Sequence, residues 1–373
     1  MTVDVKKTIV VATGIYAPEI GGPATYLSHI VPQLQRMGHT VKIVTYGEPR
    51  DGCITVSRKR NIISRMYHFY RAVVDASKDA DVIFATDIFS AGYPALRAAK
   101  KLQKRFVVRF VGDVVWETMR SESKTTLPFD EFQRRKVSFL YECARKMQRR
   151  VIREADEVLT VSRQLANIAK EWGSAHVTQV ANCVDDIKVD SSQILRKKWG
   201  ITQSDFVIAS IGRLTNYKRV EDIIAAVSKA AVTENAAASW KLMVAGDGPQ
   251  MTRLRDIASC AGVTFLGSID QTKVRELLTI CDVLVVASEY EGMSHTILEA
   301  LALGKTVVAS DVDGNTELLS DGHSGFIFPL GDSAMLSEIL LKIADGTFKL
   351  RVSRWKPISH KEWLMHNSEV ITR

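Results

Sequence analysis

The sequence has few cysteines, and their spacing argues against several classes of protein. Its 373 residues include five cysteines, which are scattered along the chain and never form a Cys-X-X-Cys pair. Neither a disulfide framework nor a zinc site is therefore indicated, and a reducing cytoplasm is the simplest setting. No apolar run approaches the roughly 18 residues of a membrane-spanning helix. The N-terminus leads directly into a strand pattern instead of a signal peptide.

Acidic residues are scarce, relative to basic ones, only in the first half of the chain. Residues 1–190 contain 30 lysines and arginines against 21 acidic residues, whereas residues 191–373 contain 20 against 21. The net charge of +8 thus comes from the first half. This asymmetry favours an anionic partner for that half, either a membrane surface or an acidic substrate. The alternative is that the basic side chains only solvate helices.

Length and hydrophobic periodicity predict two α/β domains. Single cores stop growing at roughly 250 to 300 residues, so a chain of this length suits two domains. Short apolar runs, typical of buried parallel strands, alternate with helical patterns in both halves. A polar segment at residues 187–203 is interpreted as the linker. The predicted strands are 8–12, 40–45, 81–85, 106–111, 157–161 and 177–181 in the first half, and 206–211, 241–245, 264–266, 283–287 and 306–309 in the second.

Glycines and polar groups follow several of the first-half strands. Gly21 and Gly22 lie in the turn after the first strand, where adjacent glycines allow backbone amides to approach a ligand, although a plain tight turn also explains them. The turn lacks the Gly-X-Gly-X-X-Gly fingerprint, which argues against a nicotinamide enzyme. Asp113 follows a later strand and is expected in the ligand crevice, unless it only caps a helix. The helix after the glycine turn is predicted to bury Tyr26, Leu27, Ile30, Val31 and Leu34.

One long amphipathic helix is predicted at residues 128–153. Apolar residues recur on one side, while arginines and lysines crowd the remainder with few acids between them. Such a helix can lie on anionic lipid, where each cation near the surface contributes about 1 kcal/mol. The alternative is a core-packing helix with a solvated charged face. Nucleic acid is not indicated as a partner, because the sequence has no recognition motif or aromatic stacking array.

The second half contains a strand, a loop, a helix and a second strand within residues 281–310. Glu291 and Glu299 lie eight positions apart across the loop-to-helix junction, where helix amides attract phosphate. Upstream, Arg213 and Lys218 follow another strand, and converging cations can grip a diphosphate. A surface pair in a polar loop is the alternative. Close backbone approach is further permitted by two glycines of a neighbouring turn, Gly246 and Gly248.

Several segments span most of residues 8–332, namely APEIGG, VANCVDD, GRLTNYK, VAGDGP, EGMSHTILEALALG and VDGNTELLSDG. In their order and spacing, these segments resemble the family-4 retaining glycosyltransferases, also called glycosyl transferases group 1. The resemblance implies the α/β GT-B fold, in which two Rossmann-like parallel-sheet domains face each other across a cleft. It also implies an acceptor-binding domain at 1–190, a nucleotide-sugar-binding domain at 191–345, and a C-terminal helical segment at 346–373 that crosses back to the first domain.

The resemblance further implies roles for individual residues. Arg213 and Lys218 match the cation pair that holds the donor diphosphate and stabilises the leaving nucleotide. Glu291 matches the acid beside the donor sugar, and Glu299 matches the acid that binds the ribose hydroxyls. A family histidine near the reacting carbon is absent here, which makes Asp113 the candidate substitute. Donor contacts are also implied for Gly21, Gly22, Gly212, Gly246, Gly248, Met293, Ser294, His295, Thr296 and Ile297.

We therefore expect a hexosyltransferase that moves a sugar from a nucleotide-diphosphate sugar to an acceptor hydroxyl with retention at the anomeric carbon. The expected acceptor is a lipid-linked or cell-surface glycan of polysaccharide biosynthesis, and the expected location is the cytoplasm, peripheral on the inner face of the cytoplasmic membrane. No metal or other cofactor is expected, because the resemblance assigns charge stabilisation to Arg213, Lys218 and helix amides. The alternatives are a nucleotide-sugar 2-epimerase or hydrolase of the same fold and a non-catalytic nucleotide-sugar-binding protein.

Overall fold

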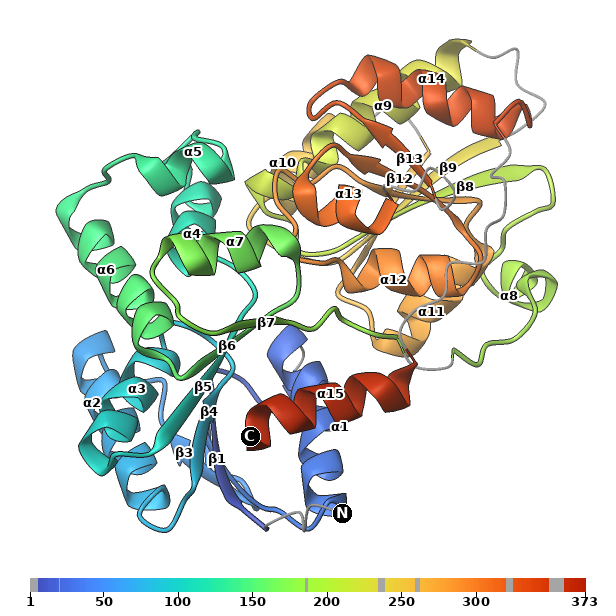
Figure 1. Ribbon diagram of the computed structural model, residues 1–373. Coiled ribbons are helices and arrows are strands. Elements are labelled where there is room, and N and C mark those ends of the chain that lie inside the picture. Colours follow the sequence, from blue (N-terminus) through green and yellow to red (C-terminus); the bar gives the residue numbers. More distant parts are fainter. Residues whose placement is uncertain are drawn as a thin grey trace. The chain divides into compact units, whose positions relative to one another are not determined.

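Figure 1 shows the computed structural model of the chain, which describes residues 6–19, 21–184, 187–233, 239–258, 262–319, 325–348 and 359–373. The chain forms two compact units, each with one parallel sheet. The first unit consists of Met1–Val115, Arg135–Asn182 and Ser359–Arg373, and the second of Trp116–Arg134 and Cys183–Ile358.

The first unit is built on a seven-stranded parallel sheet with the order β3-β2-β1-β4-β5-β6-β7. The order reverses direction between β1 and β4, and ligands of such sheets bind beyond the carboxyl ends of the strands at this point. The sequence pattern does not predict the edge strand β3, because only its last residue, Val56, is buried. The strands are β1 (Thr8–Thr13), β2 (Thr40–Tyr46), β3 (Cys53–Val56), β4 (Val82–Ala85), β5 (Arg105–Phe110), β6 (Glu157–Thr160) and β7 (Val177–Gln179).

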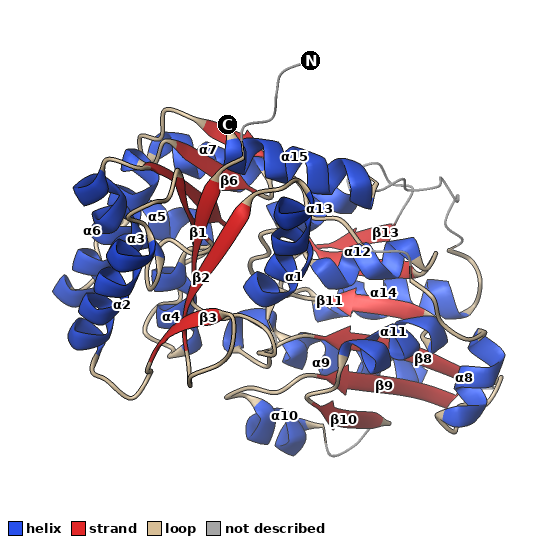
Figure 2. Cartoon of the chain, turned by 90° about the horizontal axis from the view of Figure 1, so that it is seen from below, coloured by secondary structure: helices blue, strands red, loops and turns tan. Residues whose placement is uncertain are grey.

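Helices cover both faces of the first sheet, with α2, α3 and α6 on one face and α1 and α15 on the other (Figures 1 and 2). Their bounds are α1 (Gly22–Arg36), α2 (Ile62–Ala76), α3 (Gly92–Leu102), α6 (Phe139–Glu154), α7 (Arg163–Glu171) and α15 (His360–Thr372). The hydroxyl of Tyr26 in α1 donates to Asn367 Oδ1 in α15 at 2.8 Å, and Trp363 meets the tyrosine ring edge-on at 5.5 Å. The predicted buried face of α1 is confirmed for Tyr26, Leu27, Ile30, Val31 and Leu34.

The second unit is built on a six-stranded parallel sheet with the order β10-β9-β8-β11-β12-β13. Figure 1 shows α9 and α14 on one face of this sheet and α11 and α12 on the other. Beneath α9 and α14, the strands bury Ile208, Val244 and Val285 in one hydrophobic cluster. The strands are β8 (Asp205–Ile211), β9 (Ser239–Ala245), β10 (Val263–Gly267), β11 (Val283–Val286), β12 (Thr306–Ser310) and β13 (Gly325–Phe328).

The helices of the second unit include two that the chain contributes from between β5 and β6. These are α5 (Phe129–Arg134) and all but the first two residues of α4 (Val114–Ser121). The remaining helices are α8 (Ser192–Lys198), α9 (Val220–Thr233), α10 (Met251–Ile257), α11 (Gln271–Ile280), α12 (His295–Ala302), α13 (Asp313–Leu319) and α14 (Ser333–Ala344). Two parallel α/β sheets, as predicted, are therefore confirmed.

The prediction of one long helix at residues 128–153 is wrong. Helix α5 ends at Arg134, and α6 begins only at Phe139 after Ser138 in an extended conformation. The break has a tertiary cause, because α5 packs in the second unit whereas the chain from Arg135 onward returns to the first. Apolar and basic residues that look like one helical stripe in the sequence thus serve two different packing surfaces.

The segment at residues 187–203 is not a plain linker, because it contains α8 with Leu195 buried. Other expectations fall partly outside the described ranges. These are Asp185 and Asp186 of the VANCVDD segment, residues 320–322 of the VDGNTELLSDG segment, and residues 349–358 of the predicted C-terminal helical segment.

Candidate functional site

Two glycine turns, which follow β8 and β9, lie directly against each other. A Cβ atom at Gly246 would overlap the carbonyl oxygen of Gly212, and a Cβ atom at Gly248 would overlap that of Leu214. The Leu214 amide also donates to the Asp247 carbonyl at 3.0 Å. Close packing of the two turns therefore requires glycine at both positions and orders the loop that carries the predicted cations. A direct donor contact of these glycines stays a prediction.

The structure brings Lys218 and Glu291 into direct contact. Lys218 ends the short 3₁₀ turn η1 (Asn216–Lys218), and its Nζ lies 2.6 Å from Glu291 Oε1. Ser288 Oγ donates to the same carboxylate oxygen at 2.7 Å. Burial lowers the pKa of Lys218, but the Glu291 carboxylate outweighs burial, so the pKa lies above its usual value. The ammonium is therefore charged at neutral pH and paired with an acid.

Arg213 differs from Lys218 in its surroundings. Its side chain is exposed and makes no hydrogen bond or ion pair with any residue that the structure describes. The third cation of the loop, Arg219, pairs with Asp222 at 2.6 Å. Within the described part of this loop, Arg213 is thus the cation that has no acidic partner. An incoming anion would meet its charge directly. A diphosphate could take both hydrogen-bond donors of its guanidinium edge.

Glu291 is supported by α13 and by a buried hydrogen-bond network. A Cβ atom at Gly314, in the first turn of α13, would overlap the Glu291 carbonyl oxygen. Ser310 Oγ donates to the Ser288 carbonyl at 2.6 Å, and Asn315 Nδ2 donates to the Ser310 carbonyl at 3.1 Å. These contacts hold the loop that follows β11 against the last residue of β12 and the first turn of α13. Sequence reasoning missed them, because a glycine and an asparagine in a helix carry no local signal of the loop they support.

Changing Gly314 to alanine is expected to displace Glu291 while leaving the fold intact. The added methyl group must push the Glu291 backbone away, and a displacement of about 1 Å can cost roughly 100-fold in rate. We expect kcat of the reaction at this site to fall about tenfold or more. Circular dichroism reports folding, and Thr316→Ala in the same helix is the control. Full activity of a folded Gly314→Ala variant would show that the contact does not position Glu291.

Helix α12 begins beside the ion pair. Ser294 caps it, with Oγ accepting a hydrogen bond from the Ile297 amide at 3.4 Å. The side chains of Met293 and Ile297 are buried, so only their backbone groups could reach a phosphate. His295 and Thr296 are partly exposed. The amides and the positive end of the helix dipole suit an anion here, and the predicted donor contacts of these residues remain predictions.

Glu299 lies one turn further along α12 and is held by α11. Gln271 Nε2 donates to Glu299 Oε1, and Arg275 Nε lies 3.9 Å from the same oxygen. The Glu299 side chain is only 10% exposed. Neither partner could be found from the sequence, because both lie on a separate helix and no local pattern links them to α12.

In the first unit, Asp113 is fully buried at the start of α4. Its Oδ1 accepts hydrogen bonds from the Val115 amide at 2.9 Å and from Gln148 Nε2 at 2.8 Å. The bond from the Val115 amide is that of a helix cap, the alternative that the sequence left open, and the bond from Gln148 ties Asp113 to α6. A catalytic role stays a prediction. Gly22 begins α1 with open space where a side chain would lie, whereas a Cβ atom at Gly21 would press on Ile15.

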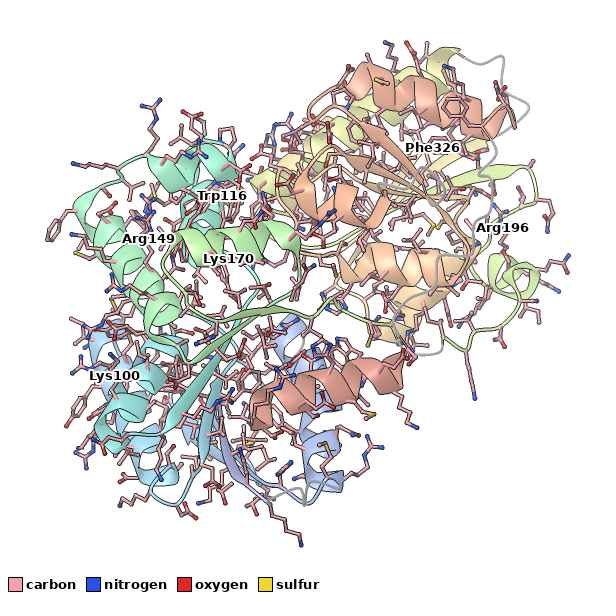
Figure 3. All side chains as sticks on the ribbon, viewed as in Figure 1. Lys100, Trp116, Arg149, Lys170, Arg196 and Phe326 are labelled. Carbon is pink, nitrogen blue, oxygen red and sulfur yellow. The ribbon has the colours of Figure 1, made fainter. Side chains whose placement is uncertain are left out.

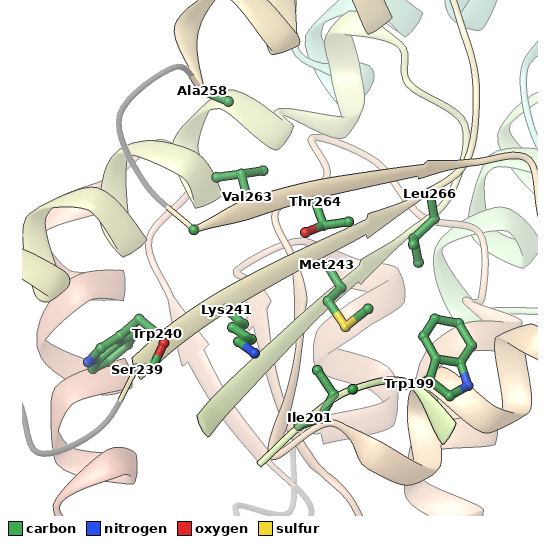
Figure 4. A pocket seen from close by; sticks show the side chains of 12 residues that line it. Trp199, Ile201, Ser239, Trp240, Lys241, Met243, Ala258, Val263, Thr264 and Leu266 are labelled. Atoms are coloured by element: carbon green, nitrogen blue, oxygen red, sulfur yellow. The ribbon is translucent and has the colours of Figure 1, made fainter. Parts of the chain in front are cut away.

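A cavity of about 590 Å³ in the second unit contains none of the predicted site residues. It lies over β9 and β10, and Trp199, Met243 and Leu266 point into it (Figure 4). Within the described ranges, no three His, Cys, Asp or Glu side chains are grouped as a metal site requires.

Two family models match this chain. The model described as Glycosyltransferase Family 4 matches residues 20–187, and the model described as Glycosyl transferases group 1 matches residues 191–355. Among curated proteins, the N-acetyl-alpha-D-glucosaminyl L-malate synthase of Bacillus anthracis is 26% identical over 352 residues, which cover 87% of this chain and 85% of that protein.

Solved structures resemble the whole chain. Sucrose-phosphate synthase from Thermosynechococcus elongatus has a TM-score of 0.73 at 17% identity, with 98% of this chain and 95% of that chain covered. Anabaena HepE in complex with UDP-glucose has a TM-score of 0.72 at 18% identity, with 98% and 94% covered. At these identities the likeness concerns the fold, and it confirms the predicted GT-B architecture of two parallel-sheet domains.

Proposed function

Because this chain belongs to the family-4, group 1 glycosyltransferases, we propose that it moves a hexose from a nucleotide-diphosphate sugar to an acceptor hydroxyl with retention at the anomeric carbon. The single observation that carries the proposal is the arrangement after β8 and β11. There Lys218, on the same loop after β8 as the exposed Arg213, lies 2.6 Å from Glu291 on the loop after β11. The two cations, Arg213 and Lys218, suit a diphosphate leaving group.

The proposed chemistry follows from the charge that develops during transfer. As the bond from the anomeric carbon to the diphosphate oxygen breaks, negative charge grows on the diphosphate, and Arg213 and Lys218 stabilise it. The acceptor oxygen forms its bond to the same face of the carbon, and its proton passes to the released phosphate oxygen. Glu291 orients the donor sugar, and Glu299 accepts hydrogen bonds from the ribose hydroxyls. No carboxylate nucleophile is invoked, in contrast to a double displacement.

Metal independence is part of the proposal. It rests on Arg213 and Lys218, which can supply the charge stabilisation that a divalent cation provides elsewhere. We expect turnover to persist in excess EDTA. Loss of turnover in EDTA and its recovery with Mg²⁺ or Mn²⁺ would overturn this part of the proposal.

The proposed acceptor is a lipid-linked or cell-surface glycan, with the enzyme bound peripherally to an anionic membrane. Phe139 and Leu140 at the start of α6 are 81% and 79% exposed, and the exposed Arg135 and Lys136 precede them. Figure 3 labels two further basic residues of this unit, Arg149 of α6 itself and Lys100 of α3. Such a patch suits insertion of apolar side chains beneath anionic headgroups. No helix among the described residues has the length and hydropathy to cross a bilayer.

Liposome flotation tests the membrane part. Wild-type protein is expected to float with vesicles containing phosphatidylglycerol, and high salt or replacement of Phe139 and Leu140 by alanine should release it. Replacing Ile194, an exposed apolar residue of α8 in the second unit, is the matched control. If high salt and the replacement of Phe139 and Leu140 leave flotation unchanged, or if the wild-type protein does not float, the patch does not bind membranes.

The sugar-transfer proposal is tested by ligand screening followed by product analysis. Thermal shift is measured with UDP, GDP, ADP and their sugars, since a ligand at 100 times its Kd stabilises by about 2.7 kcal/mol. UDP-glucose comes first, because HepE was solved with it. Proton NMR of the product then reports stereochemistry, and an inverted anomer contradicts the mechanism. Free sugar or an epimer without acceptor favours the hydrolase or epimerase alternative, and binding without turnover favours a non-catalytic protein.

A further inference from the structure

A segment from between two strands of the first sheet is built into the second unit. Residues 116–134, here termed the α4–α5 segment, lie in sequence between β5 and β6 yet belong to the second unit. The segment approaches the two loops that carry Lys218 and Glu291. It makes ionic and aromatic contacts there. The residues that make these contacts are not among those assigned to donor binding.

The ionic contact is a two-pronged hydrogen bond between Arg120 and Glu289. Arg120 Nε donates to Glu289 Oε2 and Arg120 Nη2 donates to Glu289 Oε1, both at 2.6 Å. Arg219 Nη1 donates to Glu289 Oε1 at 3.2 Å, so that the carboxylate is shared by two arginines. The side chains of Arg120 and Glu289 are only 15% and 9% exposed. A planar fork of this kind fixes orientation as well as distance.

The aromatic contact joins the same two loops. Trp116 is fully buried, and its ring centroid lies 5.5 Å from those of both Tyr217 and Tyr290. Phe129 stacks on Tyr290 at 4.0 Å. Tyr217 immediately precedes Lys218, and Tyr290 immediately precedes Glu291. The segment thus packs on the neighbours of both members of the ion pair.

The two loops are also joined by their own backbone, because the amide of Glu289 donates to the carbonyl of Tyr217 at 2.7 Å. In addition, the loop after β8 contacts the α4–α5 segment, since Asn216 Nδ2 donates to Ser123 Oγ at 2.7 Å. Between β11 and α12 the loop has no regular secondary structure, so its shape depends on such contacts. Glu289, two residues before Glu291, is therefore the point at which Arg120 of the α4–α5 segment contacts the loop that carries Glu291.

We propose that Arg120 is a positioning residue for the Lys218–Glu291 pair. By holding Glu289, it sets the separation of the two loops and hence the strength of the ion pair that meets the donor. This role rests on the proposed function only for its effect on sugar transfer. Its effect on Lys218 itself can be measured without any substrate.

The first test follows the titration of Lys218. The rate at which an amine-reactive reagent labels Lys218 is measured against pH by peptide mass spectrometry. In the wild type, the Glu291 partner raises the pKa of Lys218. Loss of the Arg120 charge alone would raise the pKa of Lys218, whereas a loosened Lys218–Glu291 pair lowers it. We expect the second effect to dominate, so that Arg120→Ala moves this titration to lower pH and increases labelling at a fixed pH about threefold or more, since a 0.5-unit shift is a factor of about three. Arg120→Lys, which keeps the charge without the fork, should lie between the two.

The matched control is Arg196→Ala in the same unit. Arg196 pairs with Asp282 at 3.2 Å and is 12% exposed, which is similar to Arg120, and neither of these residues contacts the two loops. If Arg120 has only a structural role, both variants should lower thermal stability alike and leave the Lys218 titration unchanged. That result in a folded Arg120→Ala or Arg120→Lys protein would overturn the proposal.

The second test follows catalysis. With the donor found by screening, Arg120→Ala is expected to lower kcat about 10- to 100-fold, as for a small displacement of a catalytic group, with a smaller change in KM. Arg196→Ala should retain wild-type kcat. A kcat unchanged by Arg120→Ala would count against the proposal. If the wild type transfers no sugar but Arg120→Ala still shifts the Lys218 titration, the proposed function fails and the positioning contact stands.

Discussion

Replacing Lys218 by alanine is expected to lower kcat about 100- to 1,000-fold, the usual cost of removing one group that stabilises developing charge. The ammonium stays protonated at neutral pH, paired with Glu291 at 2.6 Å, and in the proposed mechanism its positive charge stabilises the leaving diphosphate. The effect should fall on kcat and on kcat/KM alike, because the charge on the diphosphate is greatest in the transition state. Steady-state kinetics with the screened donor measures it.

Lys241→Ala is the control for general loss of an ion pair in this unit. Lys241 lies 2.9 Å from the nearly buried Asp205, so its removal also leaves an acid without that partner. Lys218→Arg separates charge from shape, since arginine keeps the charge on a larger planar group. Equal losses of turnover in the Lys218→Ala and Lys241→Ala variants would indicate that only stability is affected. Unchanged turnover in Lys218→Ala would remove this residue from the mechanism.

Replacing Glu299 by alanine is expected to weaken nucleotide-diphosphate binding about 10- to 100-fold, because the proposed hydrogen bonds between the ribose hydroxyls and this charged group would be lost. The carboxylate is held in place by Gln271 and lies 3.9 Å from Arg275, so it is oriented before a ligand arrives. We expect kcat at saturating donor to change less than KM. Isothermal titration calorimetry with the preferred nucleotide diphosphate measures the affinity directly.

A 2′,3′-dideoxy nucleotide makes the Glu299 test specific for the ribose. Removing the hydroxyls and removing the carboxylate should not add, because each change deletes the same interaction. Glu276→Ala, which removes a paired acid on α11, is the control. Additive losses, or a Glu299→Ala variant that binds as tightly as the wild type, would show that Glu299 does not hold the ribose.

Much of the fold could be predicted from the sequence because buried parallel strands are recognisable as continuous apolar runs. The strand at 283–287 and its observed counterpart β11 (Val283–Val286) illustrate this, as does the buried face of α1. The edge strand β3 was missed because its exposed positions interrupt the apolar pattern. The helix expected at 128–153 was wrong because the position at which a chain moves from one packed unit to another leaves no trace in helical periodicity.

The sequence by itself determined the residue types at the candidate site and their order along the chain. Arg213, Lys218, Glu291 and Glu299 all follow recognisable strand ends, where the rules for parallel sheets place ligands. Only the tertiary structure decided which of them touch. It pairs Lys218 with Glu291, leaves Arg213 exposed, and assigns Glu299 to Gln271 and Glu289 to Arg120. The physical reason is that side-chain partners are chosen by the packing of whole loops and helices, which brings together residues as far apart as 120 and 289, whereas periodicity and spacing carry information only within one element.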